Sequence, residues 1–424
     1  MPRVSDLLWV LSSFVLTALS HIFFSHGPDF TGGAYYIAFV MTYSLAVFIL
    51  DKFKLLKDGE IKSIYFFLGS LILFAGYPLF ENDHFRYLWE GKVFLQGLNP
   101  YLNAPNSPLL SHLVFEGKEF IGFKSLTSIY PPLGLLWMGL GGLIGSKGGL
   151  FLLMGLNALL VYFLFTRLLQ WKVRPLHLAL VFPYFQKEFI QSIHIDLLAF
   201  MFIFLFLTVR QSRAKMLLLI AMSYWVKILG ILALPIVFFR DEKKGPLFWI
   251  SAALVVLSLP LVFYFYIGDM TGPSAFGSKW VWMPGFYTIL TRVMGVAGSS
   301  ARAFSLMAFV VYLLFVLFHF RFKNKNELNF LYLVFLGVMF FSPVYNAWYA
   351  IWFLGLALLL RSNFGVLYGV FSCWGYIAWG NSSLIPLGEI MAHFFFPFCL
   401  WEVSFLSSRS ARSIEQKISK ISLQ

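Results

Sequence analysis

The sequence predicts an all-α, polytopic integral membrane protein with about 11–14 transmembrane helices and short helices in its outer-face loops. Three observations support this prediction: 59% of the 424 residues are hydrophobic, only 12% are charged, and the mean hydropathy is +0.78. A soluble globular protein carries about 25% charged residues. Many segments of the chain also reach the length of about 20 apolar residues that crosses a bilayer. The chain therefore uses lipid as part of its solvent.

Apolar runs separated by short polar loops follow one another along the chain, and we interpret them as helices. They lie at roughly residues 7–25, 34–50, 62–80, 148–169, 175–187, 194–210, 214–226, 228–240, 247–267, 302–321, 328–342, 347–361, 364–380 and 385–406. Several of these runs are too short to cross a bilayer alone. Runs 214–226 and 228–240 are expected to form a hairpin of half-spans, because basic residues flank both of their outer ends.

Basic residues gather in the short loops between these runs, which is the positive-inside pattern that sets membrane orientation. They are Lys52, Lys54, Lys57, Lys62, Arg167, Lys172, Arg174, Arg210, Arg213, Lys215, Arg240, Lys243, Lys244, Arg321, Lys323, Lys325, Arg409, Arg412, Lys417 and Lys420. With these loops in the cytosol, both termini are cytosolic in the inner (plasma) membrane. This distribution accounts for the net charge of +13 without nucleic-acid binding. The first apolar run follows Arg3 and has no clear cleavage site, so we expect a retained anchor.

Small and sulfur-containing residues indicate packing rather than chemistry. Cys373 and Cys399 both lie in apolar runs without metal-ligand spacing, so we expect neither a disulfide nor a metal site there. The stretch "GLGGLIGSKGG" lies among apolar residues and predicts tight helix packing or a bent connection. It does not follow a strand, so a soluble nucleotide-sugar site is not supported.

Two long segments lie on the outer face in this orientation, residues 81–147 and about 268–300. The first opens with "ENDHFRYLWEGK", an acidic motif at the mouth of an apolar run. If this motif is helical from Asp83, then Asp83, Arg86, Tyr87 and Glu90 share one face, because they are three or four residues apart. Arg86 can then keep Asp83 ionised, and an ionised carboxylate can accept a proton from a sugar hydroxyl.

Two interpretations of this motif remain open from composition alone. Acids and bases often gather as a solvated cap where a helix leaves the membrane, whereas charge held at a membrane is costly and often functional. Phe85 and Trp89 lie on other faces of the same helix, and we expect them to pack into the lipid headgroup zone.

The neighbouring sequence resembles the first outer loop of polyprenyl-phosphate-sugar-dependent glycosyltransferases of the GT-C superfamily, and bacterial mannosyltransferases in particular. The resemblance rests on "DHFRYLWEGKVFLQGLNPYLNAPNSPLL" followed by "SIYPPLG". Weaker matches follow in order at "HIDLLAF", "YWVKILGILALP" and "NAWYAIWFLGLALL". The resemblance departs at "WVWMPGFY", where relatives tend to carry an Asn-Gly pair. It implies that residues 1–424 form a single transmembrane glycosyltransferase domain.

The resemblance also implies a mechanism. A polyprenyl-phosphate-linked sugar, expected to be mannose, enters from the bilayer, and an acceptor hydroxyl attacks its anomeric carbon with inversion. The acid of the first outer loop is the expected general base, which is Asp83 here, and Glu81 forms an acidic pair with it. The acceptor is expected to be a cell-envelope glycan or glycolipid on the outer face.

Positive charge is needed where the lipid phosphate leaves. Lys227 is the leading candidate, because it lies between two apolar half-segments where an ammonium needs a partner. A lysine that snorkels at a hairpin turn is the alternative. Arg86 and Lys92 are further candidates for the donor phosphate.

Substrate contacts are predicted for a wider set of polar and aromatic residues. They are His84, Tyr87, Glu90, Tyr130, His194, Asp196 and Trp348. His194 and Asp196 do not share a helical face and lack further ligands at standard spacing, so no metal and no other cofactor is expected. Asp196 as a helix cap, and Trp348 as part of an interfacial aromatic belt, remain alternatives.

Two other classes of protein share some of these sequence features. A lipid or solute transporter would also have broken helices and intramembrane charge, but its charges should lie at mid-membrane in paired halves. A polymerase or ligase of lipid-pyrophosphate glycans would need outer loops rich in arginine. The charges of this chain gather at one surface, and its outer loops hold few arginines. The sequence therefore favours an integral-membrane glycosyltransferase.

Overall fold

The computed structural model describes residues 2–24, 30–57, 60–208, 212–239, 245–266, 271–322, 326–379 and 381–409. Over these ranges the regular structure is helical, and the only β-type pairing is an isolated bridge between Trp282 and Val344. The predicted all-α class is therefore confirmed. Several predicted loop cations lie outside the described residues, namely Arg210, Arg240, Lys243, Lys244, Lys323, Lys325, Arg412, Lys417 and Lys420.

Five helices among the described residues are long and apolar enough to cross a membrane. The count rises to six if one interrupted pair of helices is taken as a single span. Shorter apolar helices of 10–17 residues accompany them, among them Glu327–Phe341 and Ala347–Leu360. A polytopic membrane protein is therefore confirmed, whereas the total of 11–14 spans, which also counted short runs, stays a prediction.

The chain divides into two compact units, each assembled from distant segments. Among the described residues, unit 1 comprises residues 2–81, 157–192 and 281–409, and unit 2 comprises residues 82–156 and 193–280. Helix α6 (Ser146–Gln170) begins in unit 2 and continues into unit 1. The single transmembrane domain predicted over residues 1–424 stays a prediction.

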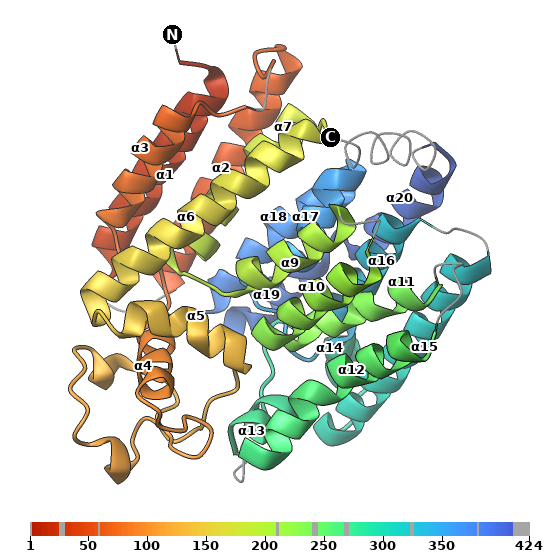
Figure 1. Cartoon of the computed structure of the whole chain (residues 1–424). Helices are drawn as coiled ribbons and strands as arrows, with labels where there is room; N and C mark the ends of the chain where they lie inside the picture. Colours follow the sequence, from red (N-terminus) through yellow and green to blue (C-terminus); the bar gives the residue numbers. More distant parts are fainter. Residues whose placement is uncertain are drawn as a thin grey trace. The chain divides into compact units, whose positions relative to one another are not determined.

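Unit 1 contains most of the long apolar helices (Figure 1). The α-helices of this unit, long and short, are α1 (Val4–Phe24), α2 (Phe30–Lys52), α3 (Ser63–Phe74), α7 (Pro175–Leu180), α8 (Phe182–Phe185), α14 (Phe286–Thr288), α15 (Gly298–Phe322), α16 (Glu327–Phe341), α17 (Ile351–Leu360), α18 (Asn363–Phe371), α19 (Ile385–His393) and α20 (Phe396–Arg409). Short 3-10 or π-helical segments continue them at Gln186–Gln191, Ile289–Val293, Ala347–Ala350, Ser372–Ala378 and Ser382–Leu384.

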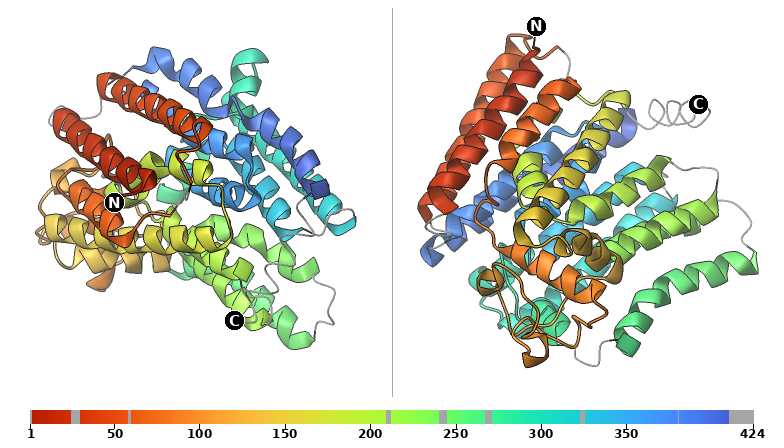
Figure 2. Two further views of the ribbon diagram at one scale, coloured as in Figure 1. Left: turned by 90° about the horizontal axis from the view of Figure 1, so that it is seen from above. Right: turned by 60° about the vertical axis from the view of Figure 1, so that its left-hand side comes forward.

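Helices α1 and α3 run side by side in unit 1, as the right-hand view of Figure 2 shows. Trp9 stacks on Phe66 with ring centroids 4.6 Å apart, and its indole N–H donates to the Phe66 carbonyl at 3.0 Å. A side chain at Gly69 would collide with the Trp9 ring. Buried hydroxyls on these helices donate to backbone carbonyls, as Thr17 does to Ile72 at 2.9 Å. Such bonds are needed where lipid offers no water.

Unit 2 carries the first outer segment and a group of shorter helices. They are α4 (Asp83–Leu95), α5 (Pro132–Gly142), α9 (Asp196–Thr208), α10 (Arg213–Val226), α11 (Leu234–Phe239), α12 (Pro246–Tyr266) and α13 (Thr271–Ser278). Three 3-10 segments lie at Pro108–Leu110, Lys118–Phe120 and Ile228–Ala233. Helix α4 begins at the residue predicted for it, and the predicted short helices in the outer segment are confirmed.

Glycines bring α4 and α5 into close contact within unit 2. A Cβ at Gly91 would lie 2.3 Å from the Gly139 backbone nitrogen, and one at Gly142 would lie 2.3 Å from the Leu88 carbonyl oxygen. Only hydrogen fits at these positions. The glycine-rich stretch thus serves tight helix packing, as the sequence predicted.

The helix α10 ends where the sequence predicted a break. Lys227 has an extended backbone, with φ −148° and ψ 130°, between α10 and the 3-10 segment Ile228–Ala233. Ser223 on α10 donates to the Ala199 carbonyl of α9 at 2.9 Å. The break therefore lies beside α9, which begins at Asp196.

Candidate active site

Helix α4 presents one partly exposed carboxylate and a set of buried polar side chains. Asp83 is half-buried in the first turn, and the preceding Asn82 is exposed. Arg86, Tyr87 and Glu90 follow on the same face and are buried. A general base that meets an acceptor from solution must remain reachable, and Asp83 satisfies this condition among the acids of the helix.

Arg86 is held by a network that uses all five of its N–H groups. Its Nε donates to Glu90 Oε1 at 2.7 Å. Its Nη1 and Nη2 donate to the carbonyls of Gly122, Phe123, Leu126 and Thr127 at 2.9–3.2 Å. An arginine has five donors and no more. We therefore assign Arg86 to holding the loop 122–127, and its predicted contact with the donor phosphate stays a prediction.

Glu90 completes this network from the other side. Ser128 Oγ donates to Glu90 Oε2 at 2.5 Å, so the carboxylate bridges α4 and the loop. Burial raises the pKa of Glu90 above its ordinary value, and the Arg86 charge and the Ser128 hydrogen bond oppose this effect. Glu90 is thus part of the scaffold beneath Asp83.

Tyr87 and His194 form a buried pair in unit 2. The Tyr87 hydroxyl lies 2.9 Å from His194 Nδ1, and the Tyr87 ring packs edge-to-face on Tyr130 at 5.4 Å between centroids. Burial raises the pKa of Tyr130 well above its ordinary value, and the charges of Asp83 and Glu90 raise it further. Tyr130 therefore stays protonated.

Asp196, which is buried, and Lys227, which is partly exposed, form a second pair. Lys227 Nζ lies 3.1 Å from Asp196 Oδ2, and the side chains are 17% and 1% exposed respectively. The same ammonium lies 5.8 Å from the centroid of the Tyr130 ring. Asp196 is the first residue of α9, so its predicted role at a helix start and its contact with Lys227 are compatible.

The structure thus brings together seven of the predicted site residues through contacts within unit 2. They are Arg86, Tyr87, Glu90, Tyr130, His194, Asp196 and Lys227. Two more predicted residues of this unit have other surroundings. Lys92 Nζ donates to the Val114 carbonyl at 2.8 Å on the exposed side of the loop, and buried His84 packs on Phe85 at 4.1 Å between centroids. Phosphate or sugar binding by these two residues stays a prediction.

Trp89 corrects one expectation about the lipid headgroup zone. Its ring is 1% exposed and packs on Phe115 at 5.7 Å between centroids, with Lys118 Nζ over it at 4.3 Å. The prediction that Trp89 reaches the headgroups is therefore wrong. The outer segment has a small apolar core of its own, which composition alone does not reveal.

Glu81 and Trp348 belong to unit 1. Buried Glu81 accepts a hydrogen bond from Lys187 Nζ at 2.6 Å and one from the Tyr376 hydroxyl at 2.5 Å. This environment gives Glu81 a structural role, and its predicted catalytic pairing with Asp83 stays a prediction. The Trp348 carbonyl accepts from the Tyr184 hydroxyl at 3.2 Å, and sugar binding by its ring is not tested.

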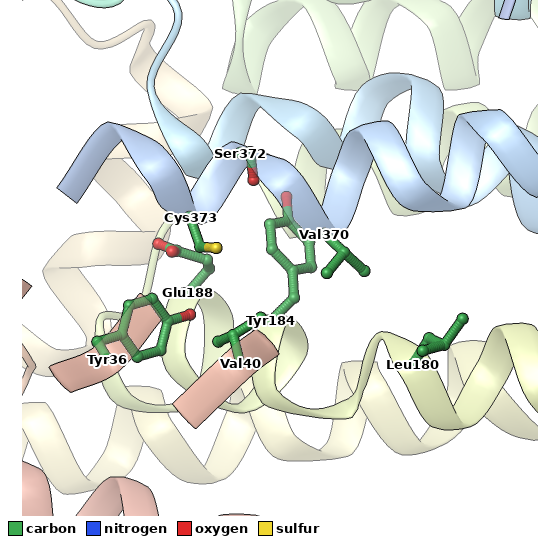
Figure 3. A pocket seen from close by; sticks show the side chains of 8 residues that line it. All are labelled: Tyr36, Val40, Leu180, Tyr184, Glu188, Val370, Ser372 and Cys373. Atoms are coloured by element: carbon green, nitrogen blue, oxygen red, sulfur yellow. The ribbon is translucent and has the colours of Figure 1, made fainter. Parts of the chain in front are cut away.

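The cluster around Glu81 was missed from sequence. Lys187 Nζ is fully buried and also lies 3.1 Å from Glu188 Oε2, and Tyr376 contacts both Lys187 and Glu188. Glu188 lines a small cavity with Tyr36, Val40, Leu180, Tyr184, Val370, Ser372 and Cys373. Figure 3 shows Glu188 and Cys373 at one end of it and Leu180 at the other. The sequence feature that could have revealed this cluster is the dipeptide Lys187–Glu188 inside an apolar run, because charged residues there require a partner.

A membrane chain with an acid at the start of helix α4, and with a lysine and tyrosines in the same unit, fits a GT-C-like glycosyltransferase. Residues 62–240 match the family described as alpha-(1->6)-mannopyranosyltransferase, N-terminal domain. The match confirms the resemblance and supports a mannosyltransferase. No curated protein and no solved structure matched the chain. The matched segment contains every predicted site residue except Trp348.

Proposed function

We propose that this mannosyltransferase moves mannose from a polyprenyl-phosphate donor to a cell-envelope glycan or glycolipid on the outer face of the membrane. The observation that carries the proposal is the position of Asp83. It is a half-buried carboxylate at the start of α4, the helix that also carries Tyr87. Tyr87 packs on Tyr130, and Lys227 Nζ lies 5.8 Å from the centroid of the Tyr130 ring. The proposed base Asp83 and the ammonium of Lys227 therefore both belong to unit 2.

The reaction proposed is a direct displacement. The acceptor hydroxyl attacks the anomeric carbon of mannose, a new C–O bond forms there, and the bond from that carbon to the phosphate oxygen breaks. The hydroxyl proton passes to Asp83, and polyprenyl phosphate leaves with the electron pair. The family's name describes an α-(1→6) product. With inversion, this product requires a β-linked donor and an acceptor that offers a primary 6-hydroxyl.

Lys227 is the group proposed to meet the leaving phosphate. Its ammonium is partly exposed and is oriented by Asp196 at 3.1 Å. A fixed positive charge at the leaving group stabilises the transition state without reorganisation during the reaction. Tyr87, Tyr130 and His194 then line the space between base and cation as hydrogen-bonding contacts to the sugar.

The test is Asp83→Asn in nanodiscs, assayed with radiolabelled polyprenyl-phosphate sugars. We expect the mannose donor to be used, and we expect the variant to fold normally and lose transfer by about 10²–10⁴-fold. The matched control is Glu116→Gln, which neutralises an exposed acid of the same outer segment and should leave transfer unchanged. NMR of the product determines its anomeric configuration.

Two results would contradict the proposal. Wild-type transfer by the Asp83→Asn variant removes Asp83 as the base. Transbilayer flux of the lipid-linked sugar without transfer, kept in the Asp83→Asn variant, assigns the chain to the transporters instead.

A further inference from the structure

Phe123 combines an exposed aromatic ring with an unfavourable backbone. Its side chain is 56% exposed, and its φ is +51°, in the left-handed region. Glycine adopts this region readily, whereas a bulky side chain there is uncommon. Because the ring is not packed in a core, packing does not explain why phenylalanine stands at this position. Strain of this kind gathers at binding and catalytic sites.

The loop around Phe123 is held in place by the network of Arg86. Nη1 of Arg86 donates to the Phe123 carbonyl at 3.1 Å and to the Gly122 carbonyl at 3.2 Å. These two bonds hold the backbone carbonyls immediately before and after the Cα atom of Phe123. The ring is therefore presented to the surface by a rigid support.

A second aromatic segment of unit 2 packs against this ring. Trp280 lies edge-to-face on Phe123 with centroids 4.6 Å apart, and Phe276 stacks on Trp280 at 6.2 Å. Helix α13 is joined to the loop where the Gly272 N–H donates to Thr127 Oγ1 at 3.1 Å. Trp280 and Phe276 are half-buried. We call Phe123, Phe276 and Trp280 the aromatic platform.

The platform lies beside the proposed base. Asn82, the residue before Asp83, donates from Nδ2 to the Phe120 carbonyl at 2.7 Å. A Cβ at Gly122, the residue before Phe123, would lie 3.5 Å from Asn82 Oδ1. Asn82 is exposed and Asp83 half-buried. The residue that precedes Asp83 therefore contacts the segment that carries Phe123.

We propose that the aromatic platform is the acceptor subsite and binds a pyranose ring of the acceptor glycan. This inference rests on the proposed function. The C–H face of a pyranose packs on aromatic rings, while its hydroxyls remain free for chemistry. A sugar held on Phe123 and Trp280 would present a hydroxyl toward Asp83.

A lipid surface is the other ligand that exposed apolar side chains could meet. The most exposed ones on this segment are Leu109 and Val114, at 72% and 85%, and they are aliphatic. Insertion into lipid needs neither a strained backbone nor a second aromatic ring fixed against the first. The observations at Phe123 therefore favour a carbohydrate.

Phe123→Gly is the decisive variant, because glycine adopts φ +51° without strain and the backbone bonds to Arg86 remain. We expect an unchanged or higher thermal midpoint. We expect the acceptor KM for α-(1→6)-linked mannotriose to rise about tenfold, with the donor KM unchanged. Trp280→Ala should act in the same direction, and Trp280→Phe should restore part of the affinity. Val114→Ala is the matched control for an exposed apolar side chain.

Saturation-transfer NMR with mannotriose and nanodisc-embedded protein measures binding without turnover. We expect signal for the wild type and for Asp83→Asn, and loss of signal for Phe123→Gly. If the wild type transfers no mannose from any lipid donor, the proposed function fails, and this binding experiment still decides about the platform.

Three results would overturn the platform. The first is an unchanged acceptor KM in Phe123→Gly and Trp280→Ala. The second is the absence of mannotriose binding to the wild type. The third is strong quenching of Trp280 fluorescence by brominated lipids in wild-type nanodiscs, compared with a Trp280→Phe background, which would identify the surface as a membrane contact.

Discussion

Arg86 and Glu90 lie one turn apart on α4, and Arg86 Nε donates to Glu90 Oε1 at 2.7 Å. Both side chains are buried, at 9% and 2% exposure. The guanidinium also holds four carbonyls of the loop 122–127, and the carboxylate also holds Ser128. This pair therefore connects the loop that carries Phe123 of the aromatic platform to the helix that carries Asp83.

Replacing Arg86 by methionine should destabilise the protein by about 3–5 kcal/mol, because it leaves the buried Glu90 carboxylate without its cation. Arg86→Lys keeps the charge but loses most of the carbonyl contacts, so we expect a smaller loss. Thermal unfolding in detergent measures both. The double variant Arg86→Met with Glu90→Met should be more stable than Arg86→Met alone. If Arg86→Met lowered the stability by less than about 1 kcal/mol, as for a surface ion pair, Arg86 would not have this stabilising role.

The buried carboxylate of Glu90 predicts a pH dependence of stability. Burial raises the pKa of Glu90, so the folded state binds its proton more tightly than the unfolded state does. Proton binding at Glu90 therefore stabilises the folded state fully below the ordinary glutamate pKa of about 4.3. This stabilisation is lost as the pH rises through the raised pKa of the folded state. The stability of the wild type relative to Glu90→Gln should therefore fall as the pH rises above about 4. Thermal midpoints of both proteins from pH 4 to 8 test this, and a constant difference between them would refute it.

Much of the candidate site followed from sequence because it depends on local spacing. The start of α4 at Asp83, its polar face and the break at Lys227 are set by helical periodicity and by interruption of an apolar run. The prediction that Asp196 lies at a helix start also agrees with α9. These features require only neighbours along the chain.

The partners of these residues did not follow from sequence, because they come from distant segments. Helical spacing allows Arg86 to pair with either Asp83, three residues before it, or Glu90, four residues after it. The structure shows that the hydrogen-bonded partner is Glu90. Trp89 is aromatic at a membrane exit, which is typical of the headgroup zone, yet Phe115 and Lys118 cover it. Long-range packing overrode the local pattern at both positions.

Lys227 should affect the donor rather than the acceptor. Lys227→Met removes the ammonium that lies 3.1 Å from Asp196, and we expect the KM for the polyprenyl-phosphate donor to rise at least about tenfold because a charge-assisted contact is lost. Lys227→Arg should restore part of the affinity, and the acceptor KM should stay constant. Initial rates at varied donor and acceptor concentrations separate these effects. An equal rise in both KM values, with a lower thermal midpoint, would assign Lys227 to structure instead.

Lys187 should be one of the largest single contributors to the stability of unit 1. It is 0% exposed, lies 2.6 Å from Glu81 Oε1 and 3.1 Å from Glu188 Oε2, and contacts the Tyr376 hydroxyl. Removing one partner of such a buried group costs about 3–5 kcal/mol, so Lys187→Met should lower the thermal midpoint strongly. Lys187→Met with Glu188→Gln should recover part of the loss, because one buried negative charge is removed as well.

The chain provides its own control for that measurement. Lys147 Nζ and Glu116 Oε1 are also 3.1 Å apart, but their side chains are 78% and 67% exposed. A surface pair of this kind contributes about 0–1 kcal/mol, so Lys147→Met should change the thermal midpoint little. Equal effects of Lys187→Met and Lys147→Met would show that burial adds nothing to the Lys187 cluster. The separation matches that of Lys187 and Glu188, so a large difference reports burial together with the two further partners of Lys187, Glu81 and Tyr376.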